Sequence, residues 1–384
     1  MKKIVLSMAS LATVAMAEGD INHPHERIDE KKATVLPAPI AERSLLDRFH
    51  FKNDLRLRYE SIERDDKANK YRNRYRLRLG ARVDLLDNLE LDVGMRSGFA
   101  NPTSGNQTFH DEPLKDYFFQ SLRFNVLGLA YKSENSTYKL GRHPYMMYRP
   151  IKSQLVWDND VSMNGLNYQY QDDTKIITLG ANQPSLEEAS VANDDVNLFL
   201  AQYVHTTKLE DIKLNLGTGI YYYDGLKDNT TLFGKGKGNT LNVNKSYANE
   251  YHILEGFAEV QLKDVFGMPL KVAVSIAYNF GADANNFGYD LGVQLGKAKH
   301  IGDWQVKYSY TDIQEDAVFA AYSDSDNFGG GSGAKGHAIR TKYKMGKNLY
   351  LAGNFFFDTL YASKSHTGLE ADYERVQLDC IVKF

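Results

Sequence analysis

The chain has 384 residues, of which 42% are hydrophobic and 25% are charged, and its net charge is -3 at pH 7. This slightly acidic balance excludes nucleic acid as a partner recognised by bulk charge. The single cysteine, Cys380, excludes an internal disulfide. The length allows two ordinary domains or one large β-domain.

The N-terminal segment 1–17, MKKIVLSMASLATVAMA, has the features of a cleaved secretory signal peptide. Lys2 and Lys3 precede a short apolar run, and Ala15 and Ala17 form an A-x-A exit. The run is too short for a membrane-spanning helix of about 20 residues. An apolar start to a cytosolic protein is the alternative, and the combined features favour export.

Residues 18–48 are polar and charged and contain Pro24, Pro37 and Pro39. This composition predicts a periplasmic N-terminal extension rather than part of a folded domain. From Phe49 the pattern changes to strands, so we expect the barrel domain to occupy residues 49–384.

The segment 71–84, YRNRYRLRLGARVD, has an arginine at nearly every second position. A helix turns about 100° per residue and would scatter these arginines around its circumference. In a strand, side chains alternate between two faces, so the arginines share one face and apolar residues share the other. The segment is therefore predicted to be a strand with one cationic and one apolar face.

Similar segments recur along the chain and predict an all-β fold, a transmembrane antiparallel up-and-down β-barrel of about 16 strands, within a range of about 14 to 18. In 117–131 the alternation changes phase after Val126, which predicts a bulge or a misplaced boundary. The expected strands are 49–60, 71–84, 89–97, 117–131, 137–143, 165–171, 175–182, 196–205, 212–223, 251–262, 269–279, 286–296, 304–313, 336–345, 349–358 and 372–384.

The connections between these strands alternate between long and short. Such asymmetry is typical of outer-membrane barrels, which have tight periplasmic turns and extended external loops. An even strand count then places both termini in the periplasm. We expect loop 314–335, rich in Gly and Ser, to be a mobile external loop.

The last strand, 372–384, alternates apolar and polar residues and ends on Phe384. This pattern resembles the C-terminal signal by which the barrel assembly machinery recognises Gram-negative outer-membrane barrels. A soluble domain that ends on a strand is the alternative. The signal peptide and the lack of a spanning helix favour the barrel.

The arginines are expected to face the lumen, because an Arg on the lipid face costs about 2–4 kcal/mol near the bilayer midplane. Near the short turn at 85–88, Asp84, Glu90 and Asp92 can neutralise Arg82. The remaining positive charge predicts a field that attracts anions. The predicted pore-lining basic wall comprises Lys52, Arg56, Arg58, Arg72, Arg74, Arg76, Arg78, Arg82 and Arg96.

Two interpretations of this wall remain open, a cationic lining for the pore and a structural role. In the structural interpretation, the arginines pair with acids across the lumen, such as Glu255, Glu259 and Asp290, or with an inserted loop. Aromatic residues near predicted strand ends are expected to form interfacial girdles. They are Tyr59, Tyr221, Tyr222, Tyr251, Tyr278, Phe280, Trp304 and Phe384.

Several motifs, LLDRFHFKNDLRLRYE, NRYRLRLGARVDLLDNLELDVGMRSG, NPTSGNQTF, YKLGRHP and VWDNDVSMNGLNYQY, carry a family resemblance. The chain resembles a family of putative porins of Gram-negative bacteria, most clearly over residues 45–170. The resemblance implies a diffusion channel in the outer membrane and does not name a solute. From the size of the barrel and its basic wall we expect small hydrophilic or anionic solutes. The implied partners are outer-membrane lipid and, by analogy with other porins, two further copies in a homotrimer.

Segment 144–164 would be the third external loop, which in trimeric porins folds into the lumen and narrows it. If this chain is similar, Asp158 and Asp160 face the arginine wall. The other residues that would shape the constriction are Tyr148, Arg149, Lys152 and Trp157. The alternative is that WDND at 157–160 only caps a turn, since Asp and Asn favour turns.

Motifs for catalysis, cofactors and metals are missing from the sequence. There is no H-E-x-x-H, no G-x-S-x-G and no C-x-x-C. We therefore expect no enzyme activity and no cofactor. An outer-membrane hydrolase with a nonlocal catalytic set and a non-conducting adhesin or structural barrel remain as alternatives.

Overall fold

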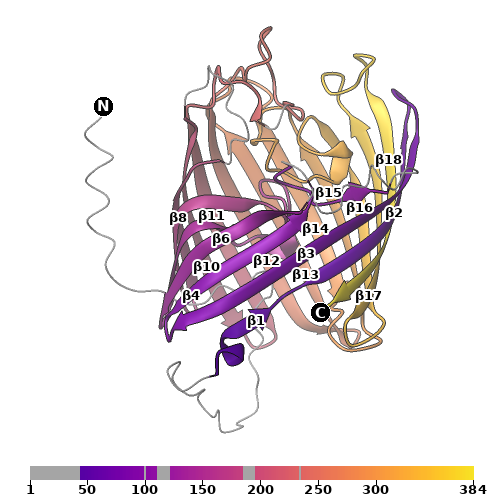
Figure 1. Ribbon diagram of the computed structural model, residues 1–384. Coiled ribbons are helices and arrows are strands. Elements are labelled where there is room, and N and C mark those ends of the chain that lie inside the picture. Colours follow the sequence, from indigo (N-terminus) through magenta and orange to yellow (C-terminus); the bar gives the residue numbers. More distant parts are fainter. Residues whose placement is uncertain (1–43, 99–100, 110–121, 185–194, 233–234) are drawn as a thin grey trace, which may run out of the picture.

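The computed structural model describes residues 44–98, 101–109, 122–184, 195–232 and 235–384. Sixteen strands form a closed antiparallel β-barrel (Figure 1). Each strand pairs with its neighbours in the chain, and pairing of the last strand with β2 closes the ring. The predicted fold class is confirmed. The predicted signal peptide, and residues 18–43 of the predicted extension, lie outside the described residues.

The bounds of the elements are as follows. The ring consists of β2 (Asp54–Arg64), β3 (Lys70–Leu86), β4 (Leu89–Ser97), β6 (Leu122–Ser133), β7 (Ser136–Pro144), β8 (Ser162–Gln171), β9 (Lys175–Asn182), β10 (Asn197–Leu209), β11 (Ile212–Asp224), β12 (Tyr251–Val265), β13 (Met268–Asn279), β14 (Phe287–Gly296), β15 (Trp304–Ile313), β16 (Ala334–Lys344), β17 (Leu349–Leu360) and β18 (Ala371–Lys383). Short strands β1 (Phe49–Phe51) and β5 (Gln107–Thr108) pair with β3, and the 3-10 helices are η2 (Leu46–Arg48), η4 (Pro150–Lys152) and η6 (Asn327–Gly329). Among the described residues, no helix has the length and hydropathy needed to cross a membrane.

The first predicted strand, 49–60, is divided in two. β1 pairs with the end of β3, the ladder is interrupted at Lys52 and Asn53, and β2 resumes the pairing at Asp54. At the interruption, the backbones of Asn53 and Phe384 exchange two hydrogen bonds of 3.1 Å. The two ends of the ring therefore meet there, and the C-terminal residue lies at the seam.

The phase change predicted in β6 is caused by a bulge. Gly94 of β4 pairs with Val126, whereas the next residue, Met95, pairs with Phe124. Asn125 therefore has no partner residue on β4, and the residues of β6 before and after it alternate in opposite phases.

Alternation separates the two faces of the wall throughout the ring. On β14, for example, Leu291 and Val293 are exposed on the outside, while Asp290 is buried inside. The girdle prediction is wrong for Tyr221 and Tyr251, which are fully buried inside the barrel because their strand positions are inward ones. The other aromatic residues of that group are exposed on the described surface: Tyr59, Tyr222, Tyr278, Phe280, Trp304 and Phe384.

An apolar cluster fills part of the barrel interior near the long loops. The rings of Phe319 and Tyr322, from the β15–β16 connection, contact each other at 5.1 Å. Phe319 also packs on the inward-facing Tyr223 and Tyr251. The expectation of a mobile external loop at 314–335 is wrong, because its residues 317–322 are buried against the wall.

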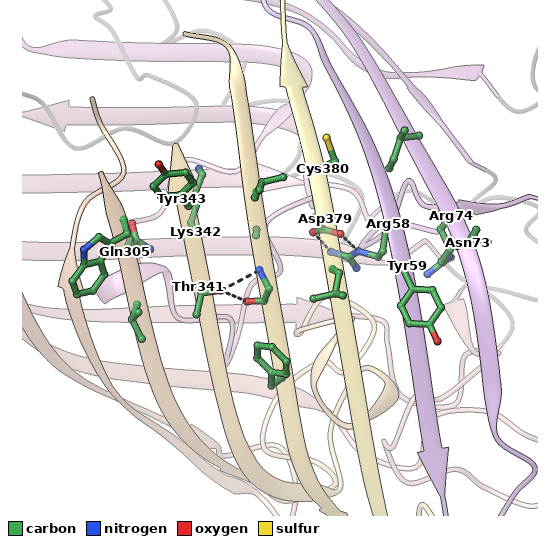
Figure 2. A pocket seen from close by; sticks show the side chains of 18 of the residues that line it. Arg58, Tyr59, Asn73, Arg74, Gln305, Thr341, Lys342, Tyr343, Asp379 and Cys380 are labelled. Carbon is green, nitrogen blue, oxygen red and sulfur yellow. Dashed lines mark hydrogen bonds and ion pairs between the residues drawn. The ribbon is translucent and has the colours of Figure 1, made fainter. Parts of the chain in front are cut away.

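The outer surface is hollowed over the strands on either side of the seam, from β15 to β3 (Figure 2). The hollow has a volume of about 940 Å³ and lies where small outward residues, Thr341 and Gly353, face each other on β16 and β17. Tyr59 and Tyr343 stand at its border (Figure 2). Behind the apolar surface, Arg58 and Asp379 join β2 to β18.

Substitutions on β14 test the assignment of the two faces. Leu291→Arg places a cation on the outward face and is expected to lower the free energy of unfolding by about 2–4 kcal/mol. Gln294→Arg places the same cation on the inward face and is expected to cost much less. Urea unfolding of the protein folded into lipid vesicles measures both values, and equal costs would contradict the assignment.

Candidate functional site: the charged interior and its crossing loop

The alternation of β2, β3 and β4 places the predicted arginines on the inward face of three neighbouring strands. Several of them lie directly opposite one another in the ladder. Arg56 pairs with Arg76, and Arg58 with Arg74. Like charges in opposite positions destabilise a sheet, so the arrangement requires carboxylates close by.

Carboxylates on the adjoining strands supply the first part of this compensation. Asp379 of β18 accepts two hydrogen bonds from Arg58, at 2.6 and 2.7 Å. Glu60 accepts one from Arg72 at 2.5 Å and one from Arg375 at 3.0 Å. These bidentate and charge-assisted contacts are the strong class of protein hydrogen bonds.

Asp54 provides a third carboxylate from β2. It lies 3.0 Å from an Arg76 nitrogen and 2.5 Å from an Arg78 nitrogen. The suggested partners Glu255, Glu259 and Asp290 make no ion pair with these arginines within the described ranges. Compensation by acids across the lumen was therefore the wrong structural interpretation, because neighbouring strands already provide the acids.

Two inward-folded loops complete the compensation. Asp160, from loop 144–164, lies 3.3 Å from Arg78 and 3.5 Å from Arg76. Asp326, from the β15–β16 connection, lies 3.0 Å from Arg375. These contacts fit the interpretation in which inserted loops supply carboxylates to the arginines.

Loop 144–164 crosses the barrel from one side to the other. Near its start, Tyr148 donates a hydrogen bond of 2.7 Å to Glu259 on β12, and the Ile151 amide donates one of 2.5 Å to the same carboxylate. Near its end, Asp160 contacts the arginines of β3. β12 and β3 are eight strands apart in either direction round the ring of sixteen, so the loop joins opposite walls.

Internal contacts hold the crossing segment in one conformation. Arg149 donates to the Ser153 carbonyl at 3.0 Å and to Asn159 Oδ1 at 2.6 Å. Trp157 is fully buried, and its ring meets that of Tyr221 edge-on at 5.0 Å. The crossing loop therefore combines an apolar anchor with a hydrogen-bonded brace.

The two aspartates of this loop have different roles. Asp158 accepts hydrogen bonds from the Asp160 amide at 2.8 Å and the Ser325 amide at 2.9 Å, so it caps a turn and ties the two loops together. Burial and the neighbouring Asp160 carboxylate raise its pKa well above the usual range. For Asp160, the attraction of Arg76 and Arg78 outweighs burial and lowers its pKa to about 2.

Not all of the predicted basic wall is enclosed. Arg72, Arg78 and Arg82 keep 30%, 39% and 40% of their side-chain surface exposed, whereas Arg58 keeps 1%. Lys52 is also exposed. Arg56 bonds to Asn106, and Arg96 donates to the Asp160 carbonyl at 3.1 Å.

The acids expected to neutralise Arg82 act separately. Glu90 lies 3.6 Å from Arg82, but Asp84 contacts His50 at 3.0 Å. Asp92 lies 3.7 Å from Lys139. Within the part of the chain that the structure describes, no group of three His, Cys, Asp or Glu side chains is placed to hold a metal ion.

Sequence reasoning missed the carboxylates Glu60, Asp54 and Asp379. Each lies on the polar face of a strand predicted at one end of the chain. Pairing the first and last strands as the closure of the barrel would have placed Asp379 beside Arg58. It would not have located Asp326, because its contact depends on how a long loop folds.

Comparisons with known proteins agree with the geometry. A family model described as putative porin matches residues 47–265 and 250–384. No curated protein matches the chain. Among solved structures, the chain is similar to Pseudomonas putida OprB at high pH, with 14% identity, a TM-score of 0.60, and coverage of 88% of this chain and 95% of that chain. It is also similar to Salmonella typhi OmpF in complex with daunomycin, with 13% identity, a TM-score of 0.52, and coverage of 88% and 97%. Both show the same barrel fold.

A double-mutant cycle on Asp160 and Arg78 measures how firmly the loop is held to the wall. Asp160→Asn and Arg78→Gln are each expected to destabilise the barrel, and their effects should be less than additive by about 1–3 kcal/mol, as for hydrogen bonds to charged groups. Urea unfolding in lipid vesicles gives the four free energies needed.

The control is a cycle on Asp211 and Lys263, an ion pair of 3.1 Å with both side chains largely exposed. The coupling between Asp211 and Lys263 should be below about 1 kcal/mol.

The ion pair of Asp160 also predicts a pH dependence. Because the pKa of Asp160 lies below the ordinary value of 3.8, the contribution of Asp160 to stability is complete above that value and is lost as the pH falls through about 2. A coupling unchanged from pH 6 to pH 2 would contradict the ion pair.

Proposed function

Because the chain belongs to the putative porin family, we propose that it forms a water-filled channel in the outer membrane for passive diffusion of small hydrophilic solutes, with a mild anion preference. The observation that carries this proposal is a closed ring of sixteen strands with charges on its inner face and a loop across its interior. Barrels of about this size are wide enough for an aqueous channel.

The anion preference is inferred from the balance of charge in the arginine cluster on β18, β2, β3 and β4. Acids compensate only part of the arginine cluster, and Arg78 and Arg82 keep much of their surface accessible to solvent. An excess of cations at a narrow passage raises the local concentration of anions. The cluster holds eight arginines, Arg56, Arg58, Arg72, Arg74, Arg76, Arg78, Arg96 and Arg375, against five carboxylates, Asp54, Glu60, Asp160, Asp326 and Asp379.

In this proposal, loop 144–164 forms the constriction. Asp160 at the arginine wall and Tyr148 at the opposite wall fix its two ends. Trp157 gives it a buried anchor between them. Solutes would then pass between the braced loop and the exposed charges of the wall, so size and charge would be selected at the same level.

The topology supports one orientation in the outer membrane. The short turns and the C-terminus lie at one end of the barrel, and the long loops lie at the other (Figure 1). We place the short turns and both termini in the periplasm, with residues 1–17 as the export signal and 18–48 as a periplasmic extension. Phe384 then serves as the assembly signal for the barrel assembly machinery.

We further propose a homotrimer, as the family resemblance implies, and mass measurement of the detergent-solubilised protein tests it. The hydrolase and adhesin alternatives gain no support from the family match or from the described site. Recording in planar bilayers separates the channel from both alternatives, because a channel gives discrete conductance steps and a hydrolase or adhesin without a pore does not.

Anion preference is tested by the reversal potential across a bilayer with a salt gradient. The unmodified channel is expected to favour chloride over potassium, and Arg78→Gln with Arg82→Gln should reduce this preference. A unit charge about 10 Å from the permeating ion contributes about 0.4 kcal/mol in water, with opposite sign for chloride and potassium, so each substitution should change the permeability ratio by up to about fourfold, less where salt screens the charge.

Lys208→Gln with Lys263→Gln is the matched control, since it removes two positive charges that lie in exposed ion pairs at the rim. It should leave the permeability ratio nearly unchanged. Cation preference in the unmodified channel would overturn the selectivity, and a silent bilayer would overturn conduction itself.

A further inference from the structure

A second cationic cluster lies on the inner wall, at the end with the short turns. Lys342 and Lys344 of β16 and Lys383 of β18 all approach the ring of Tyr350 on β17, which lies between them. Their ammonium nitrogens are 4.7, 5.5 and 5.2 Å from the centre of that ring. Three cations therefore converge on one aromatic side chain.

This cluster is compensated differently from the arginine wall. In the described ranges, none of the three ammonium groups has a carboxylate oxygen within 4.0 Å. Lys344 donates one hydrogen bond of 2.7 Å to the Lys299 carbonyl. The negative face of the Tyr350 ring attracts the cations, but an aromatic ring carries no net charge to balance them.

Lys152 of the crossing loop is a further cation, within electrostatic range of Lys342 and Lys383. Lys152 follows Ile151, and both residues have positive φ angles, 58° and 40°. A β-branched residue rarely adopts this conformation, so the turn is strained. Burial, together with the positive charges of Arg149, Lys342 and Lys383, lowers the pKa of Lys152 to about 8.

The strained turn is held by the wall beneath it. Glu259 accepts the Ile151 amide at 2.5 Å. The Ile151 side chain occupies space left by Gly292 on β14, where a Cβ atom would lie 2.2 Å from Ile151 Cδ1. The fold therefore accepts backbone strain where the crossing loop meets β12 and β14.

We propose that Lys342, Lys344 and Lys383 form a binding site for a compact multivalent oxyanion of the phosphate class. The site rests on the proposed channel, because the ligand reaches it through the lumen. Lys383 lies opposite Asp54 in the β18–β2 ladder, so the site adjoins the arginine wall and would bind anions drawn into the same passage.

The chemistry of the donors selects this ligand class. Lysine ammonium groups are compact point charges with three donors each and no acceptor. A neutral sugar needs acceptors as well as donors, and this cluster offers only the Tyr350 hydroxyl as a side-chain acceptor. A tetrahedral oxyanion presents several acceptor oxygens in different directions, so it can bridge cations that converge from β16 and β18.

Inorganic phosphate is the probe for the test, added to the full-length channel recorded in chloride. Phosphate is expected to block the chloride current at low concentration, whereas the same concentration of added chloride should not reduce the current. Lys342→Gln with Lys383→Gln should raise the half-blocking concentration about tenfold, since two of the close charges are lost. The control, Lys208→Gln with Lys263→Gln, should leave it within about twofold.

Substitution of Tyr350 tests the site without changing its charge. Tyr350→Phe keeps the ring and should retain phosphate block, whereas Tyr350→Leu removes the ring face and should weaken it. Broadening of the ³¹P resonance of phosphate by detergent-solubilised protein measures binding independently of current. It also reports on any variant that folds but conducts poorly.

The two readouts separate failure of the site from failure of the channel. Chloride current without phosphate block and without ³¹P broadening would overturn the oxyanion site and leave the channel intact. Broadening that is lost in Lys342→Gln with Lys383→Gln, from a protein that carries no current, would overturn the proposed channel and retain the site. Equal block in the cluster variant and the rim control would also overturn the site.

Discussion

The interior of this protein depends on how positive charge is compensated inside a closed wall. Placing arginines on the inner face of neighbouring strands avoids their contact with hydrocarbon, but it sets like charges opposite one another, as with Arg56 and Arg76. Carboxylates must then approach them from adjoining strands or from loops. The seam, the crossing loop and the β15–β16 connection all contribute such a carboxylate.

This requirement links the closure of the barrel to its interior. Asp379 is on the last strand, and its two hydrogen bonds to Arg58 lie beside the backbone pairing that joins β18 to β2. Asp160 and Asp326 extend the same principle to the loops. The arginines therefore act as docking points for inward-folded segments, and those that stay exposed remain available to solutes.

Loop folding is the second determinant of the interior. The apolar residues of the β15–β16 connection pack on inward aromatic side chains, as Phe319 does on Tyr251. Burying these rings removes apolar surface from water and stabilises the inward conformation. The lysines around Tyr350 lie outside this packing, and among the described residues no carboxylate oxygen lies within 4.0 Å of their ammonium groups.

Local alternation was enough to predict the barrel, the inward phase of the arginines and the phase change in 117–131, because strand periodicity is a property of short segments. The motifs over residues 45–170 were enough for the family, which the family match confirms. The strand pattern did not predict that Tyr221 and Tyr251 face inward, because an aromatic residue near a strand end can lie either in an interfacial girdle or in the interior.

The sequence by itself determined which residues alternate and how many strands cross the wall, because these features depend on neighbours in the chain. Only the tertiary structure decided which acids meet the arginines and where the long loops lie. Contacts such as Asp326 with Arg375, or Tyr148 with Glu259, join segments far apart in the chain. Their formation depends on barrel closure and loop packing, which no local pattern encodes.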